Sequence, residues 1–250
     1  IFCYHGVKEN PRPWDVTRER FSEQVEWISE KFDLMTVSQM QERRKKGNLP
    51  ENPAAFTFDD GLKSTFKARE ILDKHDVNAT FYMISGLLGE SWEGEEVVTE
   101  EDVKTLAKEG HEIGAHTVSH PHLTKLQEEN LEKEVRNSKE KLEKITGDEI
   151  TSFAYPYGDF NAKVAEVVEK TDLENALTTR PKTEINFEKP YRIPRLTIFN
   201  WHKMSHLQRF AECKNYLYRN YWYLPVDMLR NGAIPFPLKK EYKILKASLD

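Results

Sequence analysis

Cysteine, long apolar runs and any excess of basic charge are all scarce in this 250-residue chain. Two cysteines cannot build a disulfide framework, which excludes the small disulfide-stapled folds but leaves the redox compartment open. No stretch reaches the ~20 apolar residues that a membrane-spanning helix needs. The net charge is −5 and is spread along the chain, so nothing resembles the concentrated basic surface of a nucleic-acid-binding protein.

What the chain does have is enough material for a sizeable core. Hydrophobic residues make up 38% and charged residues 32%, a balance typical of a well-solvated globular protein rather than a disordered one. A length of 250 residues is ordinary for one α/β barrel. The first residue is Ile1 rather than methionine, which leaves open a signal or anchor segment ahead of it.

Short apolar strands alternate with amphipathic helices along the first 200 residues. Strands are predicted at 1–4, 34–37, 54–58, 79–84, 111–115, 151–155, 174–178 and 193–199. Thr17 and Thr99 are suited to begin helices, and Gly47, Gly110 and Gly147 to end them. Such β–α alternation favours a parallel sheet closed into a barrel. We therefore expect an α/β fold with one catalytic domain over residues 1–200.

The pattern changes from Trp201 onward. The segment begins helical, becomes rich in aromatic residues between 216 and 223, and is then broken by three prolines. We expect a C-terminal helix and an irregular tail over 201–250, packed on the same domain. Core packing is the preferred role of these aromatic side chains, and a sugar-stacking surface is the alternative.

Two adjacent carboxylates, Asp59 and Asp60, follow the strand predicted at 54–58 and precede Gly61. Barrel enzymes place their catalytic groups at this end of a strand. Adjacent carboxylates repel each other when both are ionised, unless a bound dication takes one as a ligand and leaves the other as a base. Asp-Gly is also a common turn pair, so this segment alone does not separate a site from a turn.

A histidine pair supplies the second element. His116 and His120 follow the strand predicted at 111–115, and their spacing lets two imidazoles face one point from a helix or a tight loop. Two neutral imidazoles and one carboxylate can hold a metal ion and leave positions open for water and substrate. Because carboxylates end a second strand, a shared metal site is favoured over coincidence.

A third element, 155–158 (YPYG), again lies at a strand end, where proline and glycine stiffen the loop. Together the motifs resemble the polysaccharide deacetylases of carbohydrate esterase family four, which share the chitooligosaccharide-deacetylase homology domain. The resemblance covers about residues 1–199 and is carried by segments 4–7 (YHGV), 57–61 (TFDDG), 78–81 (NATF), 110–117 (GHEIGAHT) and 155–158. It implies a distorted (β/α) barrel of about seven parallel strands and one divalent metal ion, with zinc as the expected element and other divalent transition metals as the alternative.

The resemblance also implies roles for individual residues. Asp60, His116 and His120 match the metal ligands, and Asp59 matches the general base. The backbone N–H of Tyr157 matches the group that stabilises the oxyanion. The implied activity is a metal-dependent hydrolase that removes N-acetyl groups from a polysaccharide or glycan containing N-acetylglucosamine. The family is mostly extracytoplasmic, which favours a location outside the cytoplasm or at the cell surface and leaves a cytoplasmic location as the alternative.

One departure from the family pattern concerns the residue that orients the base. Many relatives use an arginine where this chain has Ala154. Arg192 or Arg195, near the strand predicted at 193–199, is the candidate to replace it by pairing with Asp59. A purely structural ion pair is the alternative for either arginine.

The other departure concerns the general acid. The Leu-x-His motif of the family has no convincing copy here, and His5, His202 and His206 are the candidates, with return of the proton by Asp59 as a further route. These departures leave two alternative functions open: a catalytically impaired carbohydrate-binding relative, or a deacylase of another amide or ester, such as acetylated xylan or a small cyclic amide. The particular glycan and the oligomeric state are not indicated.

Overall fold

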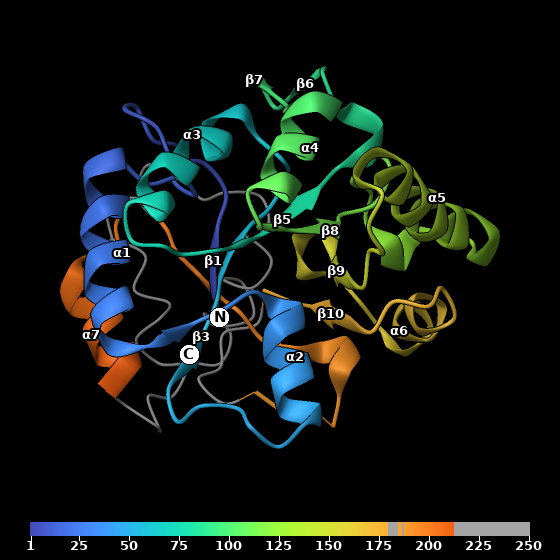
Figure 1. The fold of residues 1–250 in the computed structure, drawn as a ribbon. Coiled ribbons are helices and arrows are strands. Elements are labelled where there is room, and N and C mark those ends of the chain that lie inside the picture. Colours follow the sequence, from blue (N-terminus) through green and yellow to red (C-terminus); the bar gives the residue numbers. More distant parts are fainter. Residues whose placement is uncertain (180–184, 187, 213–250) are drawn as a thin grey trace, which may run out of the picture.

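The computed structural model of the protein describes residues 1–179, 185–186 and 188–212. Seven strands form one curled sheet in the order β10-β9-β8-β5-β4-β1-β11 (Figure 1), and every pairing is parallel. The strands are β1 Phe2–Tyr4, β4 Phe56–Phe58, β5 Thr80–Met83, β8 Glu112–Ala115, β9 Ser152–Ala154, β10 Asn175–Leu177 and β11 Leu196–Thr197. Ile193, just before β11, bridges to Leu177 at the other edge and brings the two edges together. The expected α/β fold with a distorted barrel of seven parallel strands is confirmed.

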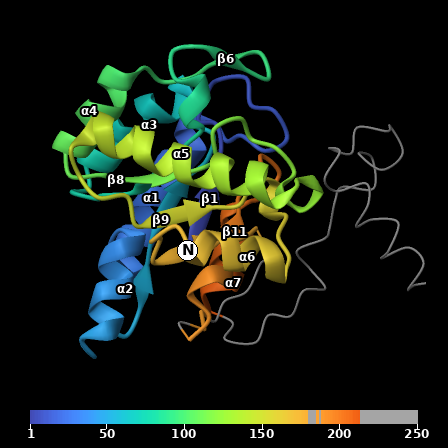
Figure 2. The same cartoon turned by 90° about the vertical axis from the view of Figure 1, so that its right-hand side faces the viewer.

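Helices surround this sheet in both views (Figures 1 and 2). α1 contacts α3, α4 contacts α5, and α5 contacts α6, while α5 also packs on β8. Thr17 and Thr99 accept hydrogen bonds from the first turns of α1 and α4 as predicted, and left-handed Gly147 ends α5. The helices are α1 Arg18–Lys31, α2 Val37–Lys45, α3 Lys63–Asp73, α4 Glu100–Lys108, α5 Glu128–Thr146, α6 Ala162–Glu169 and α7 Met204–Glu212, with short 3₁₀ turns η1 Ser85–Leu87, η2 Leu123–Lys125, η3 Pro156–Gly158 and η4 Pro190–Arg192.

Helix α2 closes one end of the barrel. Its Met40 belongs to an interior cluster with Tyr82, Ala154 and Leu177, which point inward from three different strands. The backbone N–H of Val37 donates to Thr80 Oγ1 at 3.1 Å, so the helix begins against the amino-terminal end of β5. The carboxyl ends of the strands, where Asp59 and His116 lie, are therefore at the opposite end of the barrel from α2.

The predicted strand at 34–37 is mostly wrong. The paired strand is only β2 Asp33–Leu34, which pairs with β3 Pro53–Ala54 in a separate two-stranded sheet. Thr36 caps α2 through a reciprocal capping box with Gln39, which turns Val37 into the first helical residue. The predicted strand at 54–58 is accordingly divided between β3 and β4.

A small hairpin was not predicted. β6 Ser91–Trp92 and β7 Glu95–Glu96 are antiparallel and are joined through Glu93 and Gly94, which both have positive φ, as two-residue hairpin turns require. In both views this hairpin lies at the end of the sheet opposite α2 (Figures 1 and 2). It therefore lies on the same side as the predicted catalytic residues.

The predicted C-terminal helix corresponds to α7, whose Leu207 belongs to the main hydrophobic core. The predicted aromatic tail and Cys213 lie outside the described residues. Among the residues that are described, no helix combines the length and the apolar character needed to cross a membrane.

His111 illustrates how polar residues are buried where the chain enters the sheet. Its ring packs edge-on against Phe81 at a centroid distance of 5.2 Å, and its Nδ1 accepts the backbone N–H of Ala79 at 3.2 Å. Burial lowers the pKa of His111 to about 4 from its usual value of 6.5. Folding therefore favours the neutral imidazole.

This burial predicts a pH dependence of stability. Between pH 6.5 and about 4 the unfolded chain binds a proton at His111 that the folded chain does not, so the free energy of unfolding must fall as pH is lowered through this window. His111→Asn, which keeps an acceptor for Ala79, should flatten that fall by an amount on the order of 1–3 kcal/mol. Urea unfolding of both proteins at several pH values, with a chelator present, measures the difference, and equal slopes would contradict the assignment.

Candidate active site

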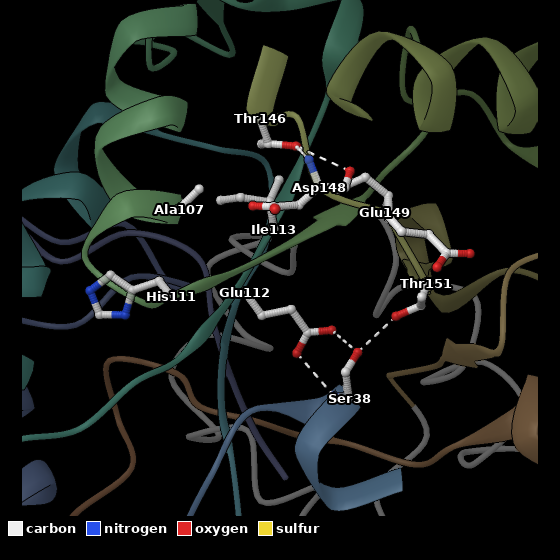
Figure 3. A pocket seen from close by; sticks show the side chains of 10 residues that line it. Ser38, Ala107, His111, Glu112, Ile113, Thr146, Asp148, Glu149 and Thr151 are labelled. Atoms are coloured by element: carbon white, nitrogen blue, oxygen red, sulfur yellow. Dashed lines mark hydrogen bonds between the residues drawn. The ribbon is translucent and has the colours of Figure 1, made fainter. Parts of the chain in front are cut away.

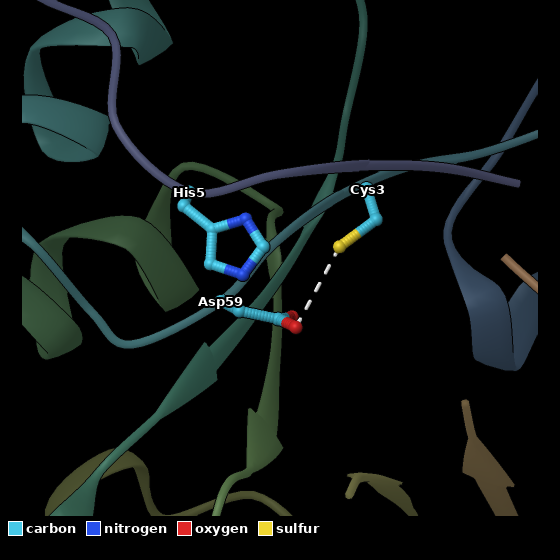
Figure 4. A group of neighbouring side chains, drawn as sticks. All are labelled: Cys3, His5 and Asp59. Carbon is cyan, nitrogen blue, oxygen red and sulfur yellow. Dashed lines mark hydrogen bonds between the residues drawn. The ribbon is translucent and has the colours of Figure 1, made fainter. Parts of the chain in front are cut away.

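Strand alternation directs a group of polar side chains into the barrel. The aromatic residues of β1 and β4 belong to the outer core between the sheet and the helices: Phe2, Tyr4, Phe56 and Phe58. Cys3 and Thr57 between them therefore face inward, and so do His5 and Asp59 one pleat further on. Figure 4 shows Cys3 and His5 beside Asp59, with Cys3 Sγ donating to Asp59 Oδ2 at 3.6 Å.

Asp59 is held by a fully buried arginine. Arg195 Nη1 donates to Oδ1 at 2.6 Å and Nη2 to Oδ2 at 2.7 Å, a bidentate pair in which both side chains are buried. Arg195 also donates to Thr57 Oγ1 at 3.1 Å and to the Thr178 carbonyl at 3.2 Å. Burial would raise the pKa of Asp59, but Arg195 and then His116 outweigh that effect and hold the pKa below its usual range. Asp59 therefore stays ionised and fixed in orientation.

The other candidate arginine is elsewhere. Arg192 ends η4 and is exposed, with its guanidinium 5.9 Å from the centre of the Phe160 ring. Of the two arginines considered from the sequence, the structure thus brings only Arg195 to Asp59.

The chain bends sharply after Asp59. Asp60 has a φ of 70° and Gly61 a φ of 66°, so the Asp60 carboxyl leaves the strand alternation. Its Oδ1 lies 3.4 Å from His116 Nε2 and 3.4 Å from His120 Nε2. One ligand atom from each of the three residues lies within 4.8 Å of the others, and all three are buried.

The histidines reach this point by different paths. His116 continues the inward alternation of β8, and its Nδ1 must donate to the Ala154 carbonyl at 2.7 Å, because a carbonyl can only accept. In the neutral imidazole Nε2 then carries the lone pair, and this atom faces Asp60. His120 returns through a loop in which Thr117 has a φ of 67° and His120 a φ of 58°. Of the two arrangements considered, a tight loop and not a helix joins the pair.

Charge couples the three residues. Burial would lower the pKa of His116, but the nearby Asp60 and Asp59 carboxylates outweigh it and raise that pKa. At His120 burial dominates, assisted by His116, and lowers the pKa to about 4. Burial would raise the pKa of Asp60, and the imidazoles around it instead hold that pKa well below its usual range. An ionised carboxylate and a neutral His120 are thus both favoured.

Backbone strain is concentrated at the same place. Seven non-glycine residues in the described part of the chain have positive φ, and four of them are Asp60, Thr117, His120 and Tyr157. Each such residue costs about 1–3 kcal/mol, and strain of this kind gathers at functional sites.

The remaining predicted site residues divide into two groups. Tyr157 lies in η3, its ring stacked on His122 at 4.2 Å and edge-on to His120 at 4.5 Å. His5 lies beside Asp59. His202 and His206 lie beyond β11, where their Nδ1 atoms accept the backbone N–H groups at 199 and 203, and their rings are 5.9 Å apart. Of the three candidate acids, the structure groups only His5 with Asp59.

Sequence reasoning missed three neighbours of the site. Cys3 is fully buried and donates a hydrogen bond to Asp59 Oδ2. Because side chains two residues apart in a strand point to the same face, the spacing from His5 was a usable signal that Cys3 faces the barrel interior. His122 follows His120 by two residues, which was a usable signal. Trp92 contacts His120 at a centroid distance of 5.3 Å from a hairpin that had not been predicted.

The comparison with known proteins agrees with this geometry. Residues 46–176 match the family model described as polysaccharide deacetylase. The chain belongs to the polysaccharide deacetylase family.

Individual members of the deacetylase family are related at moderate identity. The YxkH protein of Bacillus subtilis is 26% identical over 201 residues, which are 79% of this chain and 70% of that protein. The peptidoglycan-N-acetylglucosamine deacetylase of Bacillus cereus is 40% identical over 160 residues, 62% of this chain, which spans only 55% of that protein. The Streptococcus pyogenes deacetylase PplD in complex with acetate has a TM-score of 0.77 at 21% identity, covering 85% of this chain and 97% of its own, which shows a common fold.

Asp60, His116 and His120 form a possible metal site of the kind the family implies. The donor set suits a divalent transition ion, since it offers one carboxylate oxygen and two imidazole nitrogens. Asp60 Oδ1 is buried and accepts no hydrogen bond from any described residue, whereas His116 is anchored through its far nitrogen. Three protein ligands would leave coordination positions for water and substrate.

A separate hollow lies at the amino-terminal end of β8, away from His116 (Figure 3). Its central carboxylate already has partners: Glu112 accepts from Ser38 and from Thr80 Oγ1, and Ser38 Oγ lies 2.8 Å from Thr151 Oγ1. These contacts attach the start of α2 to the amino-terminal ends of the strands. This hollow is therefore part of the closed end of the barrel and not of the candidate site.

The Asp59–Arg195 pair predicts strong energetic coupling. Arg195→Ala leaves a buried carboxylate without its partner and should lower the free energy of unfolding by about 3–5 kcal/mol. Asp59→Asn in turn leaves the buried guanidinium without its carboxylate. The double variant should therefore lose clearly less free energy of unfolding than the two single variants lose in sum. Urea unfolding measures all three. Arg192→Ala is the control, expected within about 0.5 kcal/mol of the parent protein, and additive losses at positions 59 and 195 would refute the coupling.

Proposed function

We propose that the protein is a metal-dependent N-deacetylase of a glycan that contains N-acetylglucosamine. One observation carries the proposal: an ionised Asp59, fixed by Arg195 through contacts of 2.6 and 2.7 Å, directly precedes a carboxylate that converges with two imidazoles. A fixed base beside a cation site is an arrangement suited to metal-assisted amide hydrolysis by water.

Each nearby group has a distinct task in this reaction. A divalent cation held by Asp60, His116 and His120, zinc by preference, would supply a Lewis acid for the acetyl carbonyl and lower the pKa of a water. Asp59 would accept the proton of the attacking water, while Arg195 keeps its carboxylate oriented. The Tyr157 backbone N–H would donate to the carbonyl oxygen as negative charge develops there.

Protonation of the leaving amine is assigned to His5. It shares the inward face with Asp59, and its Nδ1 is buried without a hydrogen-bond partner among the described residues. His202 and His206 are engaged beyond β11. Transfer of the proton to the amine, with cleavage of the C–N bond, releases acetate and leaves the free amino sugar.

The substrate class is supported by the relative from Bacillus cereus, which is named a peptidoglycan-N-acetylglucosamine deacetylase and is 40% identical over the shared 160 residues. We further propose that residues 1–200 form the catalytic barrel and that residues 201–250 belong to the same domain, beginning with α7, whose Leu207 lies in the core. Release of acetate from N-acetylglucosamine oligomers, without release of acetate from acetylated xylan or ring opening of a small cyclic amide, distinguishes the proposal from other deacylase activities.

The decisive experiment follows acetate release from such oligomers. The zinc-loaded protein should release acetate, a chelator should stop the release, and added zinc should restore it. Asp59→Asn should lower kcat by about 10²–10⁴-fold, the range for loss of a general base, and His5→Gln should also lower kcat strongly. His206→Gln is the matched control and should leave kcat unchanged.

Two outcomes would reject the proposal. Metal-loaded protein that releases acetate from no acetylated glycan, yet binds N-acetylglucosamine oligomers, would identify a carbohydrate-binding relative instead. Undiminished hydrolysis by Asp59→Asn would remove the base from the mechanism.

A further inference from the structure

The two imidazoles of the possible metal site, His116 and His120, are held in place by different contacts. His116 donates from Nδ1 to the Ala154 carbonyl at 2.7 Å. His120 is only 7% exposed, and its Nδ1 is buried with no hydrogen-bond partner among the described residues. The second nitrogen of a metal-binding histidine is usually hydrogen-bonded, because that bond fixes the orientation of the ring. His120 must therefore be restrained in another way.

Aromatic rings surround His120 instead. Trp92 lies at a centroid distance of 5.3 Å and an interplanar angle of 61°, and Tyr157 at 4.5 Å and 67°. His116 adds a third edge-on contact at 4.8 Å and 65°. Edge-to-face packing at these distances is the favoured arrangement of aromatic pairs. Rotation of the imidazole about its Cβ–Cγ bond would bring it against at least one of these rings.

Trp92 comes from a hairpin that needs external support. β6 and β7 contain two residues each, too few for a stable hairpin alone. Glu95 of β7 forms ion pairs with Lys8 and Arg12. Both cations also contact the buried carboxylate of Asp15, at 3.0 Å and 2.9 Å. This network attaches the hairpin to the loop that follows β1.

The base of the hairpin is joined to the acidic turn. The Val98 N–H donates to the Gly61 carbonyl at 2.9 Å, and Leu62 and Val97 form an antiparallel bridge. Trp92 is thus tied through short backbone contacts to the segment that places Asp60. A displacement of the hairpin would alter the position of the indole relative to both Asp60 and His120.

We propose that Trp92 is a positioning residue for His120. Its ring holds the imidazole so that Nε2 points at Asp60 Oδ1, the task that the Ala154 carbonyl performs for His116. The ion pairs of Glu95 keep Trp92 in place. The inference rests on the proposed function in one respect, that Asp60, His116 and His120 bind the cation.

Metal affinity tests this role directly. Dissociation constants for Zn²⁺ are measured by competition with a chromophoric chelator, and the absorption bands of the Co²⁺-loaded protein report the ligand geometry. Trp92→Ala should weaken Zn²⁺ binding about 10-fold, the lower end of the range for residues that support a metal ligand, and should shift the Co²⁺ bands. Trp92→Phe keeps an edge-on ring and should recover most of the affinity.

Trp27→Ala is the matched control. Trp27 lies on α1 and is likewise partly buried against the core. Its ring packs on Phe32 at a centroid distance of 6.2 Å, away from Asp60, His116 and His120. It should lose thermal stability and retain the parent affinity and Co²⁺ spectrum. Glu95→Gln, which leaves the indole intact and loosens its hairpin, should give a loss of affinity between those of Trp92→Phe and Trp92→Ala.

The inference fails if Trp92→Ala binds Zn²⁺ within about twofold of the parent protein with an unchanged Co²⁺ spectrum, or if Trp27→Ala loses as much affinity. Should Trp92→Ala not fold, parent-like affinity in Glu95→Gln overturns it. A parent protein that binds no divalent cation would refute the proposed function as well. Tight binding by the parent that Trp92→Ala leaves unchanged would remove this inference alone.

Discussion

The buried contact between Arg195 and Asp59 is the interaction on which the site and the closure of the barrel both depend. Two charges removed from water are costly unless their geometry satisfies them, and here two short contacts join the guanidinium to the carboxylate. The remaining donors of Arg195 reach Thr57 on β4 and the Thr178 carbonyl just after β10. One side chain therefore connects β4 to the seam of the barrel, the place where β10 pairs with Ile193 just before β11.

That placement explains why the seam can be so sparsely bonded. Between β10 and the last strand the backbone contact is a one-residue bridge at Ile193, with hydrogen bonds to the residues at 176 and 178. Arg195 adds a side-chain bond across the same gap, from inside the barrel. Loss of Arg195 would thus weaken the closure of the sheet and leave the Asp59 carboxylate without its partner. At the α2 end the interior is instead filled by Met40 and its apolar neighbours.

The sequence predicted the parts of the site that follow from local pattern. Asp59, Asp60, His116 and His120 each lie at the end of a recognisable strand, and the structure brings all four together, although their chemical roles stay predictions. The choice between Arg192 and Arg195 could not be made locally. Asp59 and Arg195 are 136 positions apart, and the outcome depends on which residue faces inward as the chain enters β11. The hairpin that carries Trp92 was missed because its strands have two residues each and no apolar periodicity.

The side chains of the three predicted metal ligands are oriented by three different kinds of contact. Asp60 is directed by a left-handed turn, His116 by a carbonyl of the adjacent strand, and His120 by packed rings. The first two depend on backbone that the barrel itself fixes, so any chain with this fold and these residues can reproduce them. The third depends on a side chain from a hairpin outside the sheet, which ion pairs to Glu95 hold in position. Under the proposed function, variation of that hairpin would therefore tune cation binding without disturbing the barrel, whereas variation at Ala154 or Gly61 would disturb the barrel itself.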